Sequence, residues 1–187
     1  MTTRPGPRER LLEAARDLTY RRGMHVGVDA ILSAADVARR SLYQHFGGKD
    51  GLVAESLRSP AALNRLREVM DRAGDDPAER VLAAFDDLER ITTDPEFHGC
   101  RYTAAELSLT DPGHPAHAVV RAYKDDLRAV FAAELTRLGH PDPVVGATQL
   151  VVLVDGVLAY AVTRPDAHPA RAARSLAELV VGPPHPA

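Results

Sequence analysis

The side chains between Arg39 and Lys49 are those in this chain best suited to holding a charged, hydrogen-bonding partner. In the run RRSLYQHF, helical spacing directs Leu42 and Phe46 to one face. The other face then carries side chains with polar groups, which are Arg39, Arg40, Ser41, Tyr43, Gln44 and His45. Arginine can donate two parallel hydrogen bonds to guanine, glutamine can pair in the same way with adenine, and tyrosine can reach a phosphate. This face therefore predicts contact with the major groove of double-stranded DNA.

Two short helices joined by a tight turn are needed to position these side chains. The spacing of apolar residues predicts a first helix over Val28–Ala35, with Ile31 and Leu32 pointing inward. A turn follows at Asp36–Val37, and the second helix is predicted over Ala38–Phe46. This is a helix-turn-helix arrangement, in which the second helix reads the DNA.

The residues around this motif resemble the N-terminal domain of the tetracycline-repressor (TetR/AcrR) family. The resemblance is carried by Val28-Asp29-Ala30-Ile31, by Leu42-Tyr43-Gln44-His45-Phe46, and by Lys49 and Leu52 after them. It implies an all-α fold of about nine helices, with an N-terminal three-helix DNA-binding domain and a C-terminal ligand-binding and dimerisation domain. It also implies a homodimeric repressor that a small molecule releases from its operator, and it assigns Lys49 to a DNA phosphate.

Three positions depart from the usual family pattern. Gly27 stands where the first helix of the motif commonly begins on Thr or Ser, and Ala38 stands where the reader helix commonly has a hydroxyl cap. The loss of such a cap costs about 1 kcal/mol. Asp36 replaces the usual glycine of the turn, and aspartate tolerates the left-handed backbone conformation better than most residues do.

Charge is distributed unevenly along the 187 residues. The whole chain has a net charge of −3, but residues 1–58 hold ten Lys and Arg against seven Asp and Glu, and residues 59–187 hold thirteen against nineteen. The basic surplus therefore coincides with the predicted reader helix, as phosphate binding requires. We expect a DNA-binding domain over 1–58 and a ligand-binding and dimerisation domain over 59–187, with a helix kink or short break at about Arg58–Pro60.

The sequence favours a cytoplasmic protein without a cofactor or metal. Cys100 is the single cysteine, so no intrachain disulfide can form. The N-terminus has no apolar stretch that could serve as a signal peptide. The most apolar run, Leu150–Val162, is short for a membrane span and contains Asp155. His114 and His117 suggest a metal pair by their spacing, but Pro115 between them argues against it.

The C-terminal part predicts both a dimer and a ligand site. The helix predicted over Val144–Thr163 is apolar on all sides, so it must be covered on both sides, one by its own domain and the other most simply by a second copy. The helix predicted over Pro169–Val181 is expected to join the same interface. A small, mostly apolar ligand is expected to bind within this domain. The residues predicted to line its site are Met70, Phe85, Leu88, Tyr102, Glu106, Tyr123, Leu127, Phe131, Gln149 and Asp155.

Several residues have alternative interpretations. Asp155 either pairs with a neighbouring helix or the second copy, or it contacts the ligand. Arg4, Arg8 and Arg10 form either a solvated end or an arm that touches DNA. Two further classes of protein compete with the regulator: a purely structural helical dimer, and a thiol- or metal-dependent enzyme that uses Cys100, His98 and Glu106.

Overall fold

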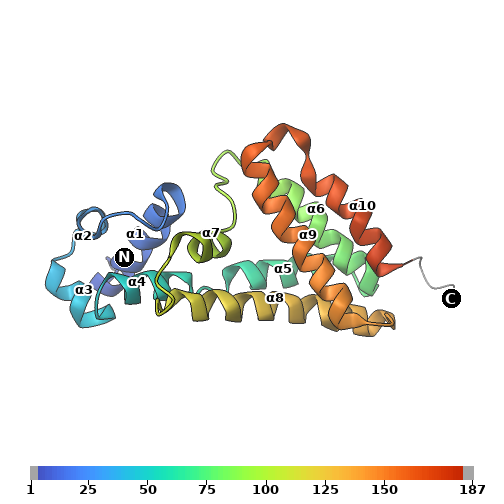
Figure 1. The fold of residues 1–187 in the computed structure, drawn as a ribbon, viewed down its shortest axis with the longest axis horizontal. Coiled ribbons are helices and arrows are strands. Elements are labelled where there is room, and N and C mark those ends of the chain that lie inside the picture. The colour runs from blue at the N-terminus through green and yellow to red at the C-terminus, as the bar shows by residue number, and fades with distance from the viewer. Residues whose placement is uncertain (1–3, 183–187) are drawn as a thin grey trace. The chain divides into compact units, whose positions relative to one another are not determined.

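The computed structural model describes residues 4–182, and their regular structure is helical, which confirms the predicted fold class (Figure 1). Where about nine helices are expected, the described residues hold ten α-helices and one short 3-10 helix, because the segment after the DNA-binding motif is divided. The elements are α1 (Pro7–Arg22), α2 (Val28–Ala35), α3 (Arg39–Phe46), α4 (Lys49–Leu57), α5 (Ala61–Arg72), α6 (Pro77–Thr92), α7 (Arg101–Ser108), α8 (Ala116–Leu138), α9 (Pro143–Thr163), η1 (Pro165–Ala167) and α10 (Pro169–Val181).

The ends of the helices follow from local chemistry. Proline occupies the first turn of α1, α6 and α9, where its missing N–H is not needed. The side chain of Asp76 accepts a hydrogen bond from the Ala78 N–H at the start of α6, and Asp142 does the same for Val145 at the start of α9. The kink or break predicted at about Arg58–Pro60 is found as a break, since α4 ends at Leu57 and α5 begins after Pro60.

The described residues form two compact units. The first holds the residues up to Ser59 together with Arg101–Ala122, and the second holds Pro60–Cys100 together with the residues from Tyr123 onward. In the first unit α1 packs against α2 and α4, and α3 packs against α4. Its core joins leucines of α1 to apolar residues of the next three helices, including Ile31, Leu42 and Leu52.

The second unit is built around α6, α9 and α10, which pack on one another, and α5, which packs on α6. Its core includes the stacked rings of Phe85 and Phe131, whose centroids lie 6.4 Å apart. A partly buried ion-pair network is centred on Arg80, which donates to Glu134, to Asp71 and to the carbonyl of Met70. Because Glu134 is almost fully buried, this network holds α6 to α8 as well as to α5.

Helix α9 is longer than the predicted apolar run. It has 21 residues and contains an 18-residue stretch with a mean hydropathy of 1.8, which is enough by length and composition to cross a membrane; 33% of that stretch is buried in the described chain. Asp155 within it forms an ion pair with Lys124 of α8. The packing of α9 on α6 and α10 is that of a core helix in a helical domain, with part of its apolar surface left uncovered.

Candidate nucleic-acid interface

The turn between α2 and α3 sets the orientation of the reader helix. Asp36 adopts the left-handed conformation, with φ 51° and ψ 54°, and its N–H bonds to the carbonyls of Leu32 and Ser33. The N–H of Val37 also reaches Leu32, so α2 is closed in the manner usual for glycine. Ala38 then caps α3 without a side-chain hydrogen bond, as Gly27 does for α2. The three expected departures therefore lie at helix caps and the turn.

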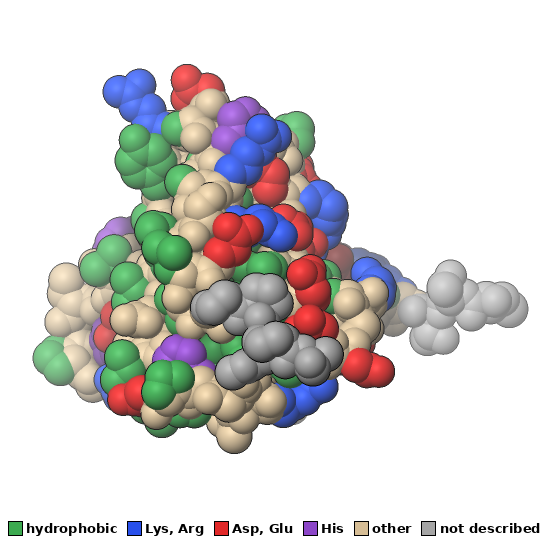
Figure 2. Space-filling model, turned by 90° about the vertical axis from the view of Figure 1, so that its right-hand side faces the viewer, with side chains coloured by type: hydrophobic (Ala, Val, Ile, Leu, Met, Phe, Trp, Pro, Cys, Tyr) green, Lys and Arg blue, Asp and Glu red, His purple; other side chains and the backbone are tan. Residues whose placement is uncertain are grey.

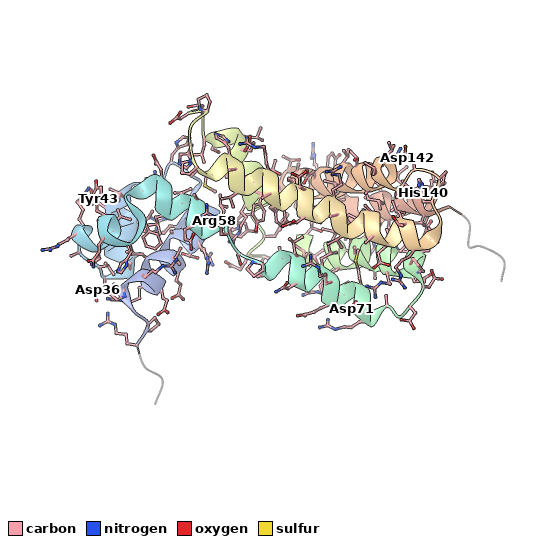
Figure 3. All side chains as sticks on the ribbon, turned by 90° about the horizontal axis from the view of Figure 1, so that it is seen from below. Asp36, Tyr43, Arg58, Asp71, His140 and Asp142 are labelled. Carbon is pink, nitrogen blue, oxygen red and sulfur yellow. The ribbon has the colours of Figure 1, made fainter. Side chains whose placement is uncertain are left out.

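The reader face of α3 is exposed, as the sequence predicts. Leu42 is 1% exposed and anchors the helix, while Tyr43 is 57% exposed. Figure 3 shows Tyr43 on the outer side of the first unit, at the end where Asp36 also lies. The remaining predicted side chains are exposed or, for one serine, half-buried; they are Arg39, Arg40, Ser41, Gln44 and His45. These groups can all be presented to one partner.

Two carboxylates on this surface hold arginines, and the sequence reasoning assigned them no such role. Asp29 of α2 forms an ion pair with Arg39 of α3. Asp36 accepts hydrogen bonds from Arg4 at 2.6 Å and from Arg10 at 3.2 Å. The bonds and charges of Arg4, and then of Arg10, lower the pKa of the Asp36 carboxyl. Arg4 and Arg10 are therefore tied to the helix-turn-helix by these ion pairs, and Arg8 contacts it by lying over the Phe46 ring.

Lys49 lies at the start of α4, where the first amides of the helix are unpaired within it. Its ammonium donates to the carbonyl of Met24 at 3.2 Å. The preceding Gly48 has φ 145°, and a Cβ atom built there would lie 3.8 Å from Cε1 of Tyr43. Tyr43 and the α4 start are thus neighbours, and together they offer a phenol, an ammonium and free amides to one anion.

Gly51 is a structural requirement of this site that the sequence reasoning missed. A Cβ atom built on Gly51 would lie 2.0 Å from the carbonyl oxygen of Phe46. The end of α3 therefore rests directly on the backbone of α4. A glycine two residues after a helix start carries no obvious signal in a single sequence, because the close approach is made by residues of the preceding helix.

The predicted ligand residues divide between the two units. In the second unit five of them are buried in the core, and they are Met70, Phe85, Leu88, Leu127 and Phe131. Tyr123 is half-buried, Gln149 is exposed, and Asp155 has Lys124 as its partner. In the first unit, Tyr102 is buried with its hydroxyl 3.4 Å from the carbonyl of Ser59, and Glu106 is bonded to His117.

A cleft of about 400 Å³ opens on the second unit between α5, α6 and α8. Its lining includes Met70 and charged side chains of both signs. The residues that line it are Arg67, Met70, Asp71, Arg80, Asp126, Ala129, Val130, Ala133 and Glu134. Figure 3 shows Asp71 on the last turn of α5, at this cleft. Of the predicted ligand residues, only Met70 lines it.

The residues of the alternative enzyme are engaged separately. Glu106 is bonded to His117, and Nδ1 of His98 lies 3.0 Å from the carbonyl oxygen of Glu96. Cys100 is half-buried just before α7. Within residues 4–182, no group of three or more His, Cys, Asp or Glu side chains is placed to hold a metal ion.

Comparison with known proteins places the exposed reader helix in a family context. Residues 11–56 match the family model described as bacterial regulatory proteins, tetR family. A crystal structure from Streptomyces avermitilis, described as a TetR transcriptional regulator, is 39% identical, with a TM-score of 0.77, and the match covers 93% of this chain and 99% of that one. The TetR-family regulator CifR, solved as a complex with 26-bp double-strand operator DNA, has the same fold at 22% identity and a TM-score of 0.77, over 96% of this chain and 98% of that one.

A curated relative is an uncharacterised helix-turn-helix regulator of Mycobacterium tuberculosis. It is 31% identical over 139 residues, which are 72% of this chain and 64% of the relative. The chain therefore spans somewhat less than two thirds of that protein.

Proposed function

Because the chain belongs to the TetR family of DNA-binding transcriptional regulators, we propose that it is a homodimeric repressor that leaves its operator when a small molecule binds. The members of this family are not enzymes, so the expectation that the chain has no catalytic activity is confirmed and the thiol- or metal-enzyme alternative is dropped. The observation that carries the proposal is the exposed face of α3, with two arginines, a tyrosine, a glutamine and a histidine beside Lys49. We take residues 1–58 as the DNA-binding domain and 59–187 as the domain for ligand and dimer contacts, and we place the protein in the cytoplasm.

The DNA test separates side chains that read bases from those that hold phosphates. The expected target is a near-palindromic duplex whose half-sites lie about 34–36 Å apart or slightly more. Tyr43→Ala and Lys49→Ala are expected to weaken binding to all sequences and to flatten its salt dependence. Arg39→Ala or Arg40→Ala is expected to relax base preference, at about 1–3 kcal/mol for a lost bidentate contact. Unchanged affinity in the triple variant of Arg39, Tyr43 and Lys49 would refute the assignment of α3.

A homodimer is supported by the apolar surface that one chain leaves uncovered. In the described part of the chain, seven of the nine large hydrophobic side chains that are exposed lie on α9 and α10: Val144, Val145, Val152, Tyr160, Val162, Leu176 and Leu179. Figure 2 shows hydrophobic side chains gathered along the left-hand edge of the face that it presents. A second copy that brings the same two helices would cover such a surface in a four-helix arrangement about a two-fold axis.

Gly156 is the position at which to test this dimer. A Cβ atom built there meets nothing within 4 Å in the single chain, so a larger side chain fits the isolated protein. Gly156→Arg is expected to give monomers by sedimentation, because it would bury a charge between the two copies. Thr136→Arg, at an exposed position of α8, is the matched control and is expected to remain dimeric. A dimer that persists in Gly156→Arg would move the interface away from α9.

The effector is expected to bind in the second unit. The apolar core there predicts a mostly apolar molecule, and the charged side chains that line the cleft between α5, α6 and α8 favour a molecule that also has polar groups. Arg80 and Glu134 at the cleft are bonded to each other, whereas Arg67 and Asp126 are exposed at its rim. A molecule with an apolar body and polar or charged ends would match both the apolar and the charged residues that line the cleft. Its binding would act on the reader helices through the helix that begins with Lys49, as the family mechanism implies.

The effector proposal is tested by filling the cleft from its surface. Ala129 and Ala133 line it and are exposed, so Ala129→Phe changes the cleft without overpacking the core. The variant is expected to bind DNA normally and to lose release by compounds that dissociate the wild-type complex. Linkage requires that such a compound bind the protein–DNA complex more weakly than the free protein. The factor must equal the one by which the compound lowers the protein's affinity for DNA. If no compound in a library raises the melting temperature or releases DNA, the effector proposal is refuted and the DNA-binding proposal stands.

A further inference from the structure

Two buried histidines join α7 and the start of α8 to the DNA-binding helices. His114 and His117 are each 8% exposed, and their rings meet edge to face with centroids 6.3 Å apart. They lie where α8 begins, within the first unit, which also contains α1 to α4. The polar nitrogens of a buried histidine ring are expected to have hydrogen-bond partners. Those partners define the protonation state of each ring.

His117 faces an acceptor on each side. Its Nδ1 lies 2.9 Å from a carboxylate oxygen of Glu106 on α7, and its Nε2 lies 3.0 Å from the carbonyl oxygen of Asp111. Neither oxygen can donate a proton while Glu106 is ionised, so both ring nitrogens must carry hydrogen. The arrangement therefore accommodates the imidazolium. A neutral ring would turn a lone pair toward one of the two oxygens.

His114 has the opposite requirement. Its Nδ1 accepts from the N–H of Ala116 at 3.1 Å, so it caps the first turn of α8 and carries no proton on that nitrogen. Its Nε2 lies 3.5 Å from Oδ1 of Asp50, and Nε2 must hold the ring proton. Asp50 is in the first turn of α4, directly after Lys49. His114 is thus a neutral ring that connects the cap of α8 to the start of α4.

The carbonyl oxygen of Asp111 links the two rings. It accepts from Nε2 of His117 and also from the backbone N–H of His114, both at 3.0 Å. Two further contacts hold α7 to the same unit: the Arg101 guanidinium lies over the Tyr20 ring, and the Tyr102 hydroxyl lies 3.4 Å from the Ser59 carbonyl oxygen. When the imidazolium loses a proton, His117 can no longer bond both Glu106 on α7 and the Asp111 carbonyl, so the link through His117 between α7 and the loop that carries His114 is broken.

We propose, on the basis of the DNA-binding function above, that His117 as an imidazolium is a positioning residue that keeps His114 against Asp50 and so holds the start of α4, with Lys49, in its DNA-binding geometry. The charged groups around the pair are Glu106 on α7, Asp50 on α4, and Arg121 on α8, whose positive charge opposes protonation of His117. The outcome is a protein whose DNA affinity falls when His117 becomes neutral.

The direction of the pH dependence follows from the contacts of His117. The hydrogen bond to Glu106 raises the pKa of His117 above 6.5, against the effect of burial. A group whose pKa is raised by folding contributes its full stabilisation below its unfolded pKa and loses it as pH rises through the folded value. DNA affinity is therefore expected to be highest near pH 6 and to decline toward alkaline pH. His45 lies on the exposed face of the reader helix, so the pH dependence is measured in a variant that lacks this second histidine.

The experiment measures operator affinity by fluorescence anisotropy across pH in a His45→Gln background. In that background we expect a decrease of about five- to tenfold from pH ~6.5 to pH ~9, the lower range of measured couplings between sites. When His117→Gln is added, operator affinity is expected to stay at its weaker, high-pH value across the whole pH range. Glu106→Gln is expected to shift the midpoint of the affinity profile to lower pH. His98→Gln is the matched control for loss of an exposed histidine, and it is expected to keep the full pH dependence.

Nitrogen-detected NMR of the histidine rings reports their protonation directly. It is carried out on the wild-type protein without DNA, so it does not require that any variant fold. His117 is expected to carry hydrogen on both nitrogens at pH ~6.5, and His114 on Nε2 alone. A neutral His117 at that pH, or the same pH profile with and without His117→Gln, would overturn this inference while DNA binding stands. Absence of operator binding by the wild-type protein at every pH would instead refute the proposed function itself.

Discussion

Gly51→Ala provides a strict test of how α3 rests on α4. In most helices this exchange stabilises a protein, since alanine is favoured over glycine by about 1 kcal/mol. At this position the added Cβ atom would lie 2.0 Å from the Phe46 carbonyl oxygen, whereas a carbon-to-oxygen contact normally needs about 3.3 Å. The last turn of α3 must then move by about 1.3 Å. Because the obstacle is backbone, no side-chain rotation can relieve it.

The expected cost is of the size of other overpacked sites, about 1–3 kcal/mol net destabilisation. For a chain of this length that corresponds to a decrease in Tm of roughly 2–12 °C, followed by circular dichroism. A second effect is expected in DNA binding, because a displacement of more than an ångström separates the reader side chains from the base edges. Operator affinity is expected to fall by about tenfold or more, the equivalent of one good base contact.

Gly27→Ala is the matched control for this prediction. It is the same exchange in the same unit, and a Cβ atom at Gly27 meets nothing within 4 Å. The control is expected to retain operator affinity and to change stability by no more than about 1 kcal/mol, the usual range for helix caps. A Gly51→Ala protein that is more stable than wild type, by the normal helix preference, would show that α3 and α4 are not in contact as described.

Three further predictions concern charged groups. Glu134→Gln keeps the shape of a buried side chain but weakens its bond to Arg80, so denaturant unfolding should report a loss of about 1–3 kcal/mol; an unchanged midpoint would mean that the network is not formed in solution. Asp29→Asn frees Arg39 and removes a negative charge beside it, so competition assays should show tighter binding to unrelated DNA and poorer discrimination of the operator; an unchanged ratio would exclude a positioning role for Asp29. The pKa of Asp36 is lowered in the folded protein, so its ion pairs contribute stability above pH 3.8 and lose it as pH falls through the folded pKa. The stability difference between wild type and Asp36→Asn should therefore vanish in acid. A difference that stays constant with pH would contradict this linkage.

The sequence by itself determined the helix-turn-helix and its exposed face. The bounds of α2 agree with the prediction, α3 begins one residue later than predicted, and Asp36 adopts the expected left-handed turn. These features are local, because the apolar period, the turn residue and the helix start all lie within about 25 residues of chain. The uncovered apolar surface of α9 was also visible in the sequence, since a helix that is apolar on all sides requires two neighbours.

Only the tertiary structure decided which charged and polar groups are already engaged. Asp29 and Arg39 are ten residues apart, Arg4 and Asp36 thirty-two, and Arg80 and Glu134 fifty-four, and no period in a sequence connects such pairs. The same limit applies to Gly51, whose neighbour belongs to the preceding helix, and to Glu106, which a composition argument assigned to a ligand and which the fold brings to His117. Side-chain chemistry indicates what a residue can bind, but its partner depends on how the helices pack.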